Sequence, residues 1–255
     1  MTKKIIFSSG GTGGHIFPAI NLMKYFSNKG YDVLLVTDIR GNTFLKNHAR
    51  FRSCIINTDT PSNKSFFRKI FSFIMILFSI TRSILILRKE KPDLIIGFGG
   101  YVSFPISFSS RFYNTPLVIY ENNLVLGRTN KNLLPLSKKL LLGTKITINV
   151  PEKYKSKVYQ VGNILREEII NYSVIRKKNS GKTFSILVLG GSQGAEVFGR
   201  IVPSAIKMLK DKGYTIGINQ QCIKQQKNSL IEFYKKNNIK SNIFDFTNNI
   251  LDLIE

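Results

Sequence analysis

Short apolar runs rich in β-branched residues alternate along the chain with longer segments that have the apolar spacing of helices. This alternation is typical of a parallel sheet covered by helices, so the sequence predicts an α/β protein. In the first half, strands are predicted at residues 5–8, 33–37, 54–57, 94–97, 117–119 and 139–142. Helices are predicted between them at residues 19–28, 66–89 and 102–112.

The pattern pauses near residues 161–163, and the polar run 176–182 precedes a new buried strand at 184–189. A helix at 195–210, a strand at 215–218, a helix at 224–236 and a strand at 242–246 follow. A chain of 255 residues exceeds the ~100 to 200 residues of one domain. We therefore predict two doubly wound domains, residues 1–163 and 164–255, and expect the second, thinner domain to be incomplete because the chain ends inside an amphipathic segment.

Three glycine-rich turns follow predicted strands and open predicted helices. Ser9 to His15 contains four glycines and precedes a helix expected to begin near Pro18; the other turns run from Gly97 to Tyr101 and from Gly190 to Gly194. Glycines allow close backbone approach, and amides at a helix start favour phosphate. Because parallel sheets bind ligands beyond their strand carboxyl ends, we expect a site in a cleft between the domains. The alternative is a set of tight turns without a ligand.

Other nucleotide-binding motifs fit less well. No Gly-Lys-Ser/Thr closes any turn, and the dinucleotide pattern requires a third glycine where Ile16 or Val102 stands. Asp38, however, ends the second strand, where a ribose-binding acid would lie. An NAD-type oxidoreductase therefore remains an alternative.

The charge predicts an anionic partner: 38 Lys and Arg against 15 Asp and Glu give a net charge of +23. A nucleic-acid-binding module is a second alternative, but a recognisable platform of interleaved aromatic and basic residues is missing, so no nucleic acid is expected. Cys54 and Cys222 have no metal or redox spacing. The first residues run directly into a strand rather than a signal peptide, so we expect a cytoplasmic protein.

Residues 64–91 are strongly apolar and carry seven basic residues against Glu90, a local charge of +6. The uncharged part, residues 70–81, is shorter than the ~20 residues that span a bilayer. We therefore predict a helix that docks on an anionic membrane surface without crossing it. The alternative is a helix buried against the sheet.

Taken together, these motifs resemble the MurG family over essentially the whole chain. The matching segments have the family's order and spacing: Gly10 to Pro18, Gly97 to Ser103, Glu121-Asn122-Asn123, Thr129-Asn130-Lys131, Val161-Gly162-Asn163 with Arg166, and Leu189 to Ala195. The family usually has Gln where this chain has Asn122, and His-Gln-x-Gly where it has residues 219–222. The family's following ribose-binding segment has no counterpart before Glu255.

The resemblance implies a GT-B fold, in which two Rossmann-like domains face a cleft, and transfer of GlcNAc with inversion. The donor would be UDP-GlcNAc, and the acceptor the MurNAc 4-hydroxyl of undecaprenyl-pyrophosphoryl-MurNAc-pentapeptide (lipid I), which gives lipid II for peptidoglycan. The protein would lie peripherally on the cytoplasmic face of the bacterial plasma membrane. Residues expected to contact the substrates are Thr12, Gly13, Gly14, Asn123, Asn130, Arg166, Ser192, Gln193 and Thr247. The residues expected to form the acceptor phosphate loops are Gly10, Gly11, Gly99, Gly100 and Tyr101.

The implied reaction needs a general base, for which His15 is the first candidate and Glu121 the second. The alternative for His15 is a residue that only orients the turn or an acceptor phosphate. Ser192, Arg166 and the amides of the third turn would stabilise the leaving diphosphate. Asn123 and Asn130 offer amides to sugar hydroxyls, or serve only as turn residues. No Asp-x-Asp pair is present, so neither a metal nor another cofactor is expected.

Overall fold

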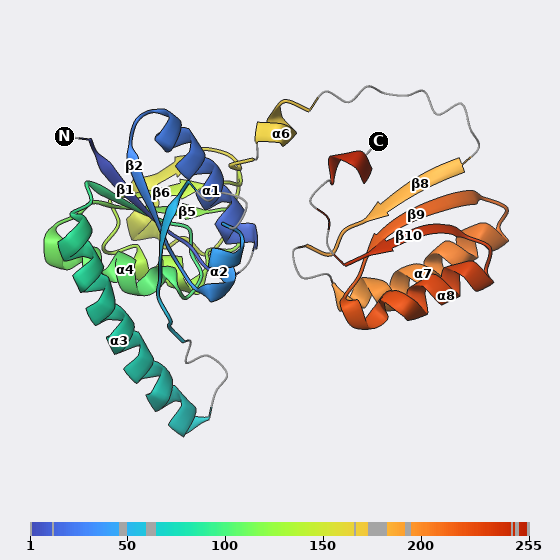
Figure 1. Ribbon diagram of the computed structural model, residues 1–255, viewed down its shortest axis with the longest axis horizontal. Helices are drawn as coiled ribbons and strands as arrows, with labels where there is room; N and C mark the ends of the chain where they lie inside the picture. Colours follow the sequence, from blue (N-terminus) through green and yellow to red (C-terminus); the bar gives the residue numbers. More distant parts are fainter. Residues whose placement is uncertain are drawn as a thin grey trace. The chain divides into compact units, whose positions relative to one another are not determined.

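The computed structural model describes residues 2–11, 13–45, 50–59, 65–165, 167–172, 183–191, 195–245, 247 and 250–253. The chain forms two compact units, Met1–Glu167 and Glu168–Glu255 (Figure 1). A short helix, α6 (Glu167–Ile170), lies at the division. Each unit contains a parallel sheet, so the predicted α/β fold is confirmed in both.

The first unit is built on a seven-stranded sheet with the order β3-β2-β1-β4-β5-β6-β7. All neighbouring strands pair in parallel. The order reverses between β1 and β4, which is the point where doubly wound sheets open a crevice at their carboxyl ends. The strands are β1 (Lys4–Ser8), β2 (Asp32–Thr37), β3 (Arg52–Ile55), β4 (Leu94–Gly97), β5 (Leu117–Glu121), β6 (Lys139–Leu142) and β7 (Val158–Gln160).

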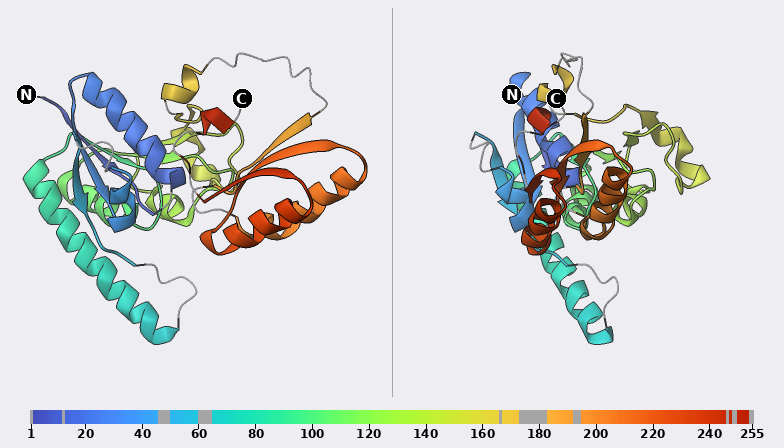
Figure 2. Two further views of the ribbon diagram at one scale, coloured as in Figure 1. Left: turned by 45° about the vertical axis from the view of Figure 1, so that its right-hand side comes forward. Right: turned by 90° about the vertical axis from the view of Figure 1, so that its right-hand side faces the viewer.

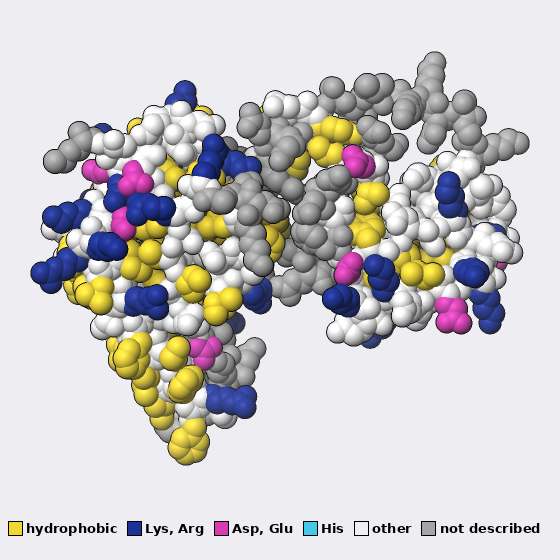
Figure 3. Space-filling model, in the orientation of Figure 1, with side chains coloured by type: hydrophobic (Ala, Val, Ile, Leu, Met, Phe, Trp, Pro, Cys, Tyr) yellow, Lys and Arg dark blue, Asp and Glu magenta, His cyan; other side chains and the backbone are white. Residues whose placement is uncertain are grey.

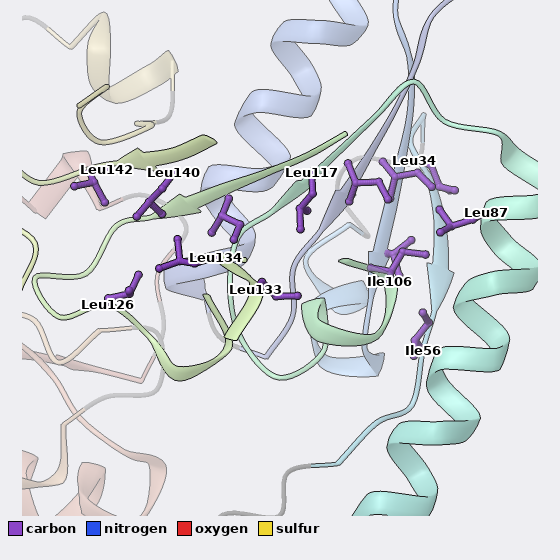
Figure 4. Packing of buried hydrophobic residues seen from close by; sticks show 14 residues of the cluster. Leu34, Ile56, Leu87, Ile106, Leu117, Leu126, Leu133, Leu134, Leu140 and Leu142 are labelled. Carbon is purple, nitrogen blue, oxygen red and sulfur yellow. The ribbon is translucent and has the colours of Figure 1, made fainter. Parts of the chain in front are cut away.

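Helices cover both faces of this sheet. One face packs on α1 (Gly13–Asn28) through a cluster that includes Phe7, Ile16 and Met23. The other face packs on α3 (Phe66–Glu90), α4 (Ser103–Ser109) and α5 (Arg128–Leu133), where Leu87, Ile106 and Leu133 meet the strand side chains (Figure 4). The shorter elements of this unit are α2 (Ile39–Thr43) and the 3-10 helices η1 (Ser110–Tyr113) and η2 (Glu152–Lys157).

The C-terminal half of α3 is anchored to the sheet, and Ser72 in its N-terminal half is buried and donates to Asp59 Oδ2 at 2.8 Å. Ser83 and Leu87 are buried, and Glu90 accepts hydrogen bonds from Lys4 Nζ at 2.7 Å and from Arg52 at 3.3 Å. The N-terminal half extends beyond the rest of the unit (Figure 2), and its apolar side chains are exposed along the projecting helix (Figure 3).

The predicted helix at 66–89 is confirmed, but the length argument against a membrane span is incomplete. That argument counted only residues 70–81, whereas the helix continues to Glu90. Within the described residues, Ile70–Glu90 is one stretch long and apolar enough to cross a membrane by length and composition, and 22% of its most apolar window is buried in the protein. The case against crossing therefore rests on the packing of Ser83, Leu87 and Glu90 against the sheet.

The second unit has a three-stranded sheet with the order β10-β9-β8. Its strands β8 (Thr183–Val188), β9 (Thr215–Gln221) and β10 (Lys240–Phe244) pair in parallel. The helices α7 (Glu196–Asp211) and α8 (Lys227–Lys236) lie on the same side of the sheet (Figure 1), where Ile206, Ile218 and Tyr234 share one core. Two 3-10 helices, η3 (Lys224–Gln226) and η4 (Leu251–Leu253), complete the described part.

The predicted start of the first helix is wrong. The helix α1 begins at Gly13, so Pro18 lies inside it rather than in its first turn. A proline has no N–H and therefore leaves the carbonyl four residues earlier, that of Gly14, without its helical donor. The Asn122 side chain supplies one, because its Nδ2 donates to the Gly14 oxygen at 2.7 Å.

Candidate active site

The first two glycine turns lie side by side at the carboxyl ends of β1 and β4, which are neighbours in the sheet. A Cβ at Gly10 would lie 2.6 Å from Cγ2 of Val102, and one at Gly100 would lie 3.3 Å from the carbonyl oxygen of Gly10. Gly11 and Gly100 also have φ values of +77°. These glycines are therefore required by the close approach of the two turns and by their backbone conformation, independently of any ligand.

The peptide groups of Gly11 are held from both sides by side chains that follow β2. Its N–H donates to Asp38 Oδ1 at 3.3 Å, and its carbonyl accepts from Arg40 Nε at 3.0 Å and Nη2 at 2.6 Å. The hydroxyl of Tyr101, from the second turn, donates to Asp38 Oδ2 at 3.4 Å. Burial and the nearby Asp38 carboxylate raise the pKa of Tyr101, so its phenol stays protonated as a donor. Both carboxylate oxygens of Asp38 are thus engaged inside the protein, which leaves it poorly suited to hold the ribose of a dinucleotide.

His15 lies in the first turn of α1 and faces the second glycine turn. A Cβ at Gly99 would lie 3.1 Å from its Cδ2 and 3.2 Å from its Nε2. Burial lowers the pKa of His15 below the ordinary value of 6.5, and the Glu121 carboxylate partly opposes that change. The imidazole is therefore neutral at pH 7 and able to accept a proton, as a general base must.

Glu121, at the end of β5, is an anchor for the surrounding turn. Its side chain is buried, with the residue 2% exposed. The Oε1 atom accepts hydrogen bonds from the N–H and the Nδ2 of Asn123 at 3.0 and 2.7 Å, and Oε2 accepts from the Gly127 N–H and from Asn130 Nδ2 at 2.8 and 3.0 Å. A carboxylate that already accepts four N–H groups is poorly placed to collect a substrate proton, so the geometry favours His15 over Glu121 as the base.

Asn130 connects Glu121 to the second glycine turn. Its Nδ2 also donates to the Tyr120 carbonyl at 3.2 Å and lies 3.2 Å from the position of a Cβ at Gly99. The residue is 1% exposed, and its Oδ1 has no hydrogen-bond partner among the residues that the structure describes. Asn123, by contrast, is exposed beside it. The first unit therefore brings His15, Asn123 and Asn130 of the predicted site to one end of the sheet.

The remaining predicted residues are distributed differently. Gly13 and Gly14 form the start of α1, where the first backbone N–H groups of a helix lack intrahelical acceptors. Thr247 is half-buried after β10 in the second unit. Four predicted contacts lie outside the described residues: Thr12, Arg166, Ser192 and Gln193.

In the second unit, the turn after β8 is fastened by Gln221 at the end of β9. The Gly190 N–H donates to Gln221 Oε1 at 3.0 Å, and Gln221 Nε2 donates to the carbonyls of Gly191 and Asp245 at 2.8 and 3.1 Å. Gly191 has a φ of +76°. Gln221 thus connects the end of β8 with the end of β10, a role that the sequence analysis missed because the residue lies where the chain departs from the expected His-Gln-x-Gly pattern.

Arg40 and Asn122 were also missed. Arg40 follows a strand end by three residues, and no motif marks it. Asn122 has a signal that can be read from sequence: Pro18 inside a helix leaves a carbonyl without its helical donor, and a polar side chain after another strand of the same sheet can donate to it. Among the described residues, no three His, Cys, Asp or Glu side chains come together as they would to hold a metal ion.

Two parallel-sheet units with glycine turns at their strand carboxyl ends, one of them beside a buried histidine, place the chain among the α/β proteins that bind ligands at those ends. Sequence models of the glycosyltransferase family 28 N-terminal and C-terminal domains match residues 5–141 and 185–255. The chain belongs to glycosyltransferase family 28.

Similar proteins agree with this assignment. The UDP-N-acetylglucosamine-N-acetylmuramyl-(pentapeptide) pyrophosphoryl-undecaprenol N-acetylglucosamine transferase of Pelagibacter ubique is 34% identical over 255 residues, which are 100% of this chain and 70% of that protein. The transferase of the same name from Rickettsia canadensis is 33% identical over 97% of this chain and 69% of its own length. The crystal structure of Acinetobacter baumannii MurG aligns with a TM-score of 0.73 at 25% identity and covers 98% of this chain and 70% of that one. Neither the nucleic-acid-binding alternative nor the oxidoreductase alternative is favoured.

Proposed function

We propose that the protein transfers GlcNAc from UDP-GlcNAc to the 4-hydroxyl of the MurNAc residue in lipid I, which yields lipid II for peptidoglycan synthesis. The similarity to transferases of this name over the whole chain carries the proposal. In this reaction the acceptor oxygen attacks the anomeric carbon, UDP leaves, and the configuration at that carbon inverts.

The contacts in the first unit support different roles for its polar residues in this reaction. His15 takes the proton of the attacking hydroxyl, because burial keeps the imidazole neutral. Glu121 holds the turn in place and favours the imidazolium that results, since its carboxylate raises the pKa of His15. The exposed Asn123 amide offers hydrogen-bonding groups to sugar or phosphate, whereas the buried Asn130 positions the turn through its contacts to Tyr120 and Glu121. Ser192, Arg166 and the third glycine turn are proposed to hold the departing diphosphate.

Transfer of labelled GlcNAc to a soluble lipid I analogue tests this function. We expect product from the unsubstituted protein and a loss of 10²-fold or more in kcat for His15→Gln, about the contribution of a general base. His48→Gln, a change of the other histidine, serves as the matched control and should retain activity. A His15→Gln protein with unchanged kcat would exclude His15 as the base, and the absence of transfer by the unsubstituted protein would refute the proposed function.

We also propose that the exposed face of α3 docks on the cytoplasmic leaflet of the plasma membrane, where a polyprenyl-linked acceptor resides. Phe71 and Phe78 are 60% and 68% exposed. Burying one such side chain contributes about 1.5 to 3 kcal/mol. Exposed basic side chains of the same helix and its C-cap, Arg68, Arg82, Arg88, Lys89 and Lys91, add attraction to anionic lipid.

Co-sedimentation with vesicles tests the docking. Binding should be stronger to vesicles with anionic lipid than to purely zwitterionic ones, and Phe71→Ser with Phe78→Ser should reduce it at least 10-fold, because two apolar side chains no longer enter the lipid. Phe184→Ser is the matched control, since Phe184 is similarly exposed at 60% but lies in the second unit. Equal losses in the two proteins would contradict docking through α3.

A further inference from the structure

The first glycine turn is fixed by two charged side chains that belong to no glycine motif. Asp38 and Arg40 follow β2 and bind opposite ends of Gly11: the carboxylate accepts its N–H, and the guanidinium donates twice to its carbonyl. Gly11 has a φ of +77°, in a region where glycine chains are conformationally free. The two contacts therefore hold a residue that has few conformational restrictions of its own.

The Asp38 carboxylate is itself held in one orientation. Its Oδ1 caps the short helix α2 by accepting the Gly41 N–H at 2.6 Å, and Tyr101 donates to Oδ2 from the second turn. A Cβ at Gly41 would collide with Thr37 Oγ1 and lie 3.1 Å from Asp38 Oδ1, so glycine is required there for this arrangement. A single buried carboxylate therefore connects the end of β2 with both glycine turns of the first unit.

We propose that Asp38 and Arg40 are positioning residues for the transfer reaction, which clamp Gly11 so that the start of α1 and His15 are presented to the acceptor in one conformation. This proposal rests on the proposed function and adds to it two residues that contact the turn rather than the reacting atoms. The clamp leaves the amides at the start of α1 available and fixes the direction in which they point.

The clamp predicts a specific kinetic pattern. A turn that is released binds the acceptor only in the fraction of molecules that hold the competent conformation, so the apparent affinity falls by that fraction. Once the acceptor is bound, it selects the competent turn and catalysis proceeds as before. We therefore expect Arg40→Met and Asp38→Ala to raise the acceptor KM about 10-fold each, with kcat changed by less than about 2-fold, as expected when charged hydrogen bonds to the turn are lost.

The test compares these two proteins with Arg111→Met, a matched control at an exposed arginine in η1 of the same unit. Deuterium exchange of residues 9–17 should be faster in both clamp variants and unchanged in the control. Arg40→Lys should partly restore KM, because an ammonium can still donate once to the Gly11 carbonyl. The double variant should be no worse than about the poorer single variant, since both changes release the same peptide.

Three results would overturn the proposal. Additive effects in the double variant would mean that Arg40 contacts the acceptor independently of Asp38. A fall in the kcat of the folded protein with an unchanged KM would mean that the two residues act in the chemical step rather than in presenting the turn, and unchanged exchange of residues 9–17 would show that the turn needs no clamp. If the unsubstituted protein transferred no GlcNAc, the proposed function alone would fail, and the exchange measurement would still decide whether the clamp exists.

Discussion

Replacing Glu121 by Gln separates an anchoring carboxylate from a catalytic base. Each carboxylate oxygen accepts two N–H groups in a buried environment. The amide nitrogen of Gln can accept none, so whichever oxygen it replaces, two donors lose their acceptor. Hydrogen bonds to charged groups contribute about 1.5 to 3 kcal/mol each. Because the substitution also removes the cost of burying a charge, we take the lower limit, a loss of about 3 kcal/mol in the free energy of unfolding.

Calorimetry provides the assay, because it can resolve the unfolding of the two units. For a unit of this size, a loss of 3 kcal/mol should lower the melting temperature of the first unit by about 6 to 12 °C. Glu152→Gln is the matched control, since Glu152 is exposed and pairs with Lys155 three residues later. The melting temperature of this control protein should not change measurably.

The opposite result would refute the reasoning. If Glu121 is the base, Glu121→Gln should keep its melting temperature and lose 10² to 10⁴-fold in kcat. If it is an anchor, the melting temperature falls, and the remaining folded protein retains the acidic limb of the pH profile that His15 produces. A stable Glu121→Gln protein would therefore require a different base assignment.

Three further predictions follow from the first unit. Burial alone would raise the pKa of Glu90, but hydrogen bonds from the basic side chains of β1 and β3 hold that pKa below the ordinary 4.5. The stability that this lowered pKa adds is complete above pH 4.5 and is lost as the pH falls through the pKa of Glu90 in the folded protein. The urea midpoints of the unsubstituted protein and of Glu90→Gln should therefore converge in acid. The lowered pKa of His15 predicts an acidic limb of kcat/KM below pH 6.5, and a limb above that value would contradict the burial argument. Gly10→Ala should cost about 1 to 3 kcal/mol of unfolding free energy through overpacking against Val102, and Val102→Ala should restore part of it in urea titrations.

Much of the fold could be predicted from local pattern, because buried parallel strands are continuous apolar runs and the connecting helices are long. The six strands predicted for the first unit are present, although the third lies at Arg52–Ile55 rather than at 54–57. The strand β7, Val158–Gln160, was missed because an edge strand of three residues, with two exposed side chains, has no apolar run to mark it. The helix α5 was missed because its six residues are mostly polar, so its apolar spacing is weak.

The candidate site could be predicted in its motifs but not in its internal contacts. The glycine turns, His15 and Glu121 are recognisable because residue type and position after a strand indicate their chemistry. Which of His15 and Glu121 carries the proton depends on hydrogen-bond partners far apart in sequence, and a single sequence does not contain that information. The same limit explains why Arg40 was overlooked: its function depends on the Gly11 carbonyl, 29 residues earlier.

The glycines of the first two turns illustrate how structural and chemical requirements are combined. Gly10, Gly99 and Gly100 each stand where a Cβ would crowd the opposite turn, and Gly11 stands where the backbone is left-handed and its N–H is already bound. A count of glycines therefore overstates the case for phosphate binding, since packing accounts for these positions. The amides at the start of α1 are the groups that such packing leaves for an anion, and the contacts from β2 and β5 fix their direction. The ligand chemistry of the turn thus depends on residues outside its own motif.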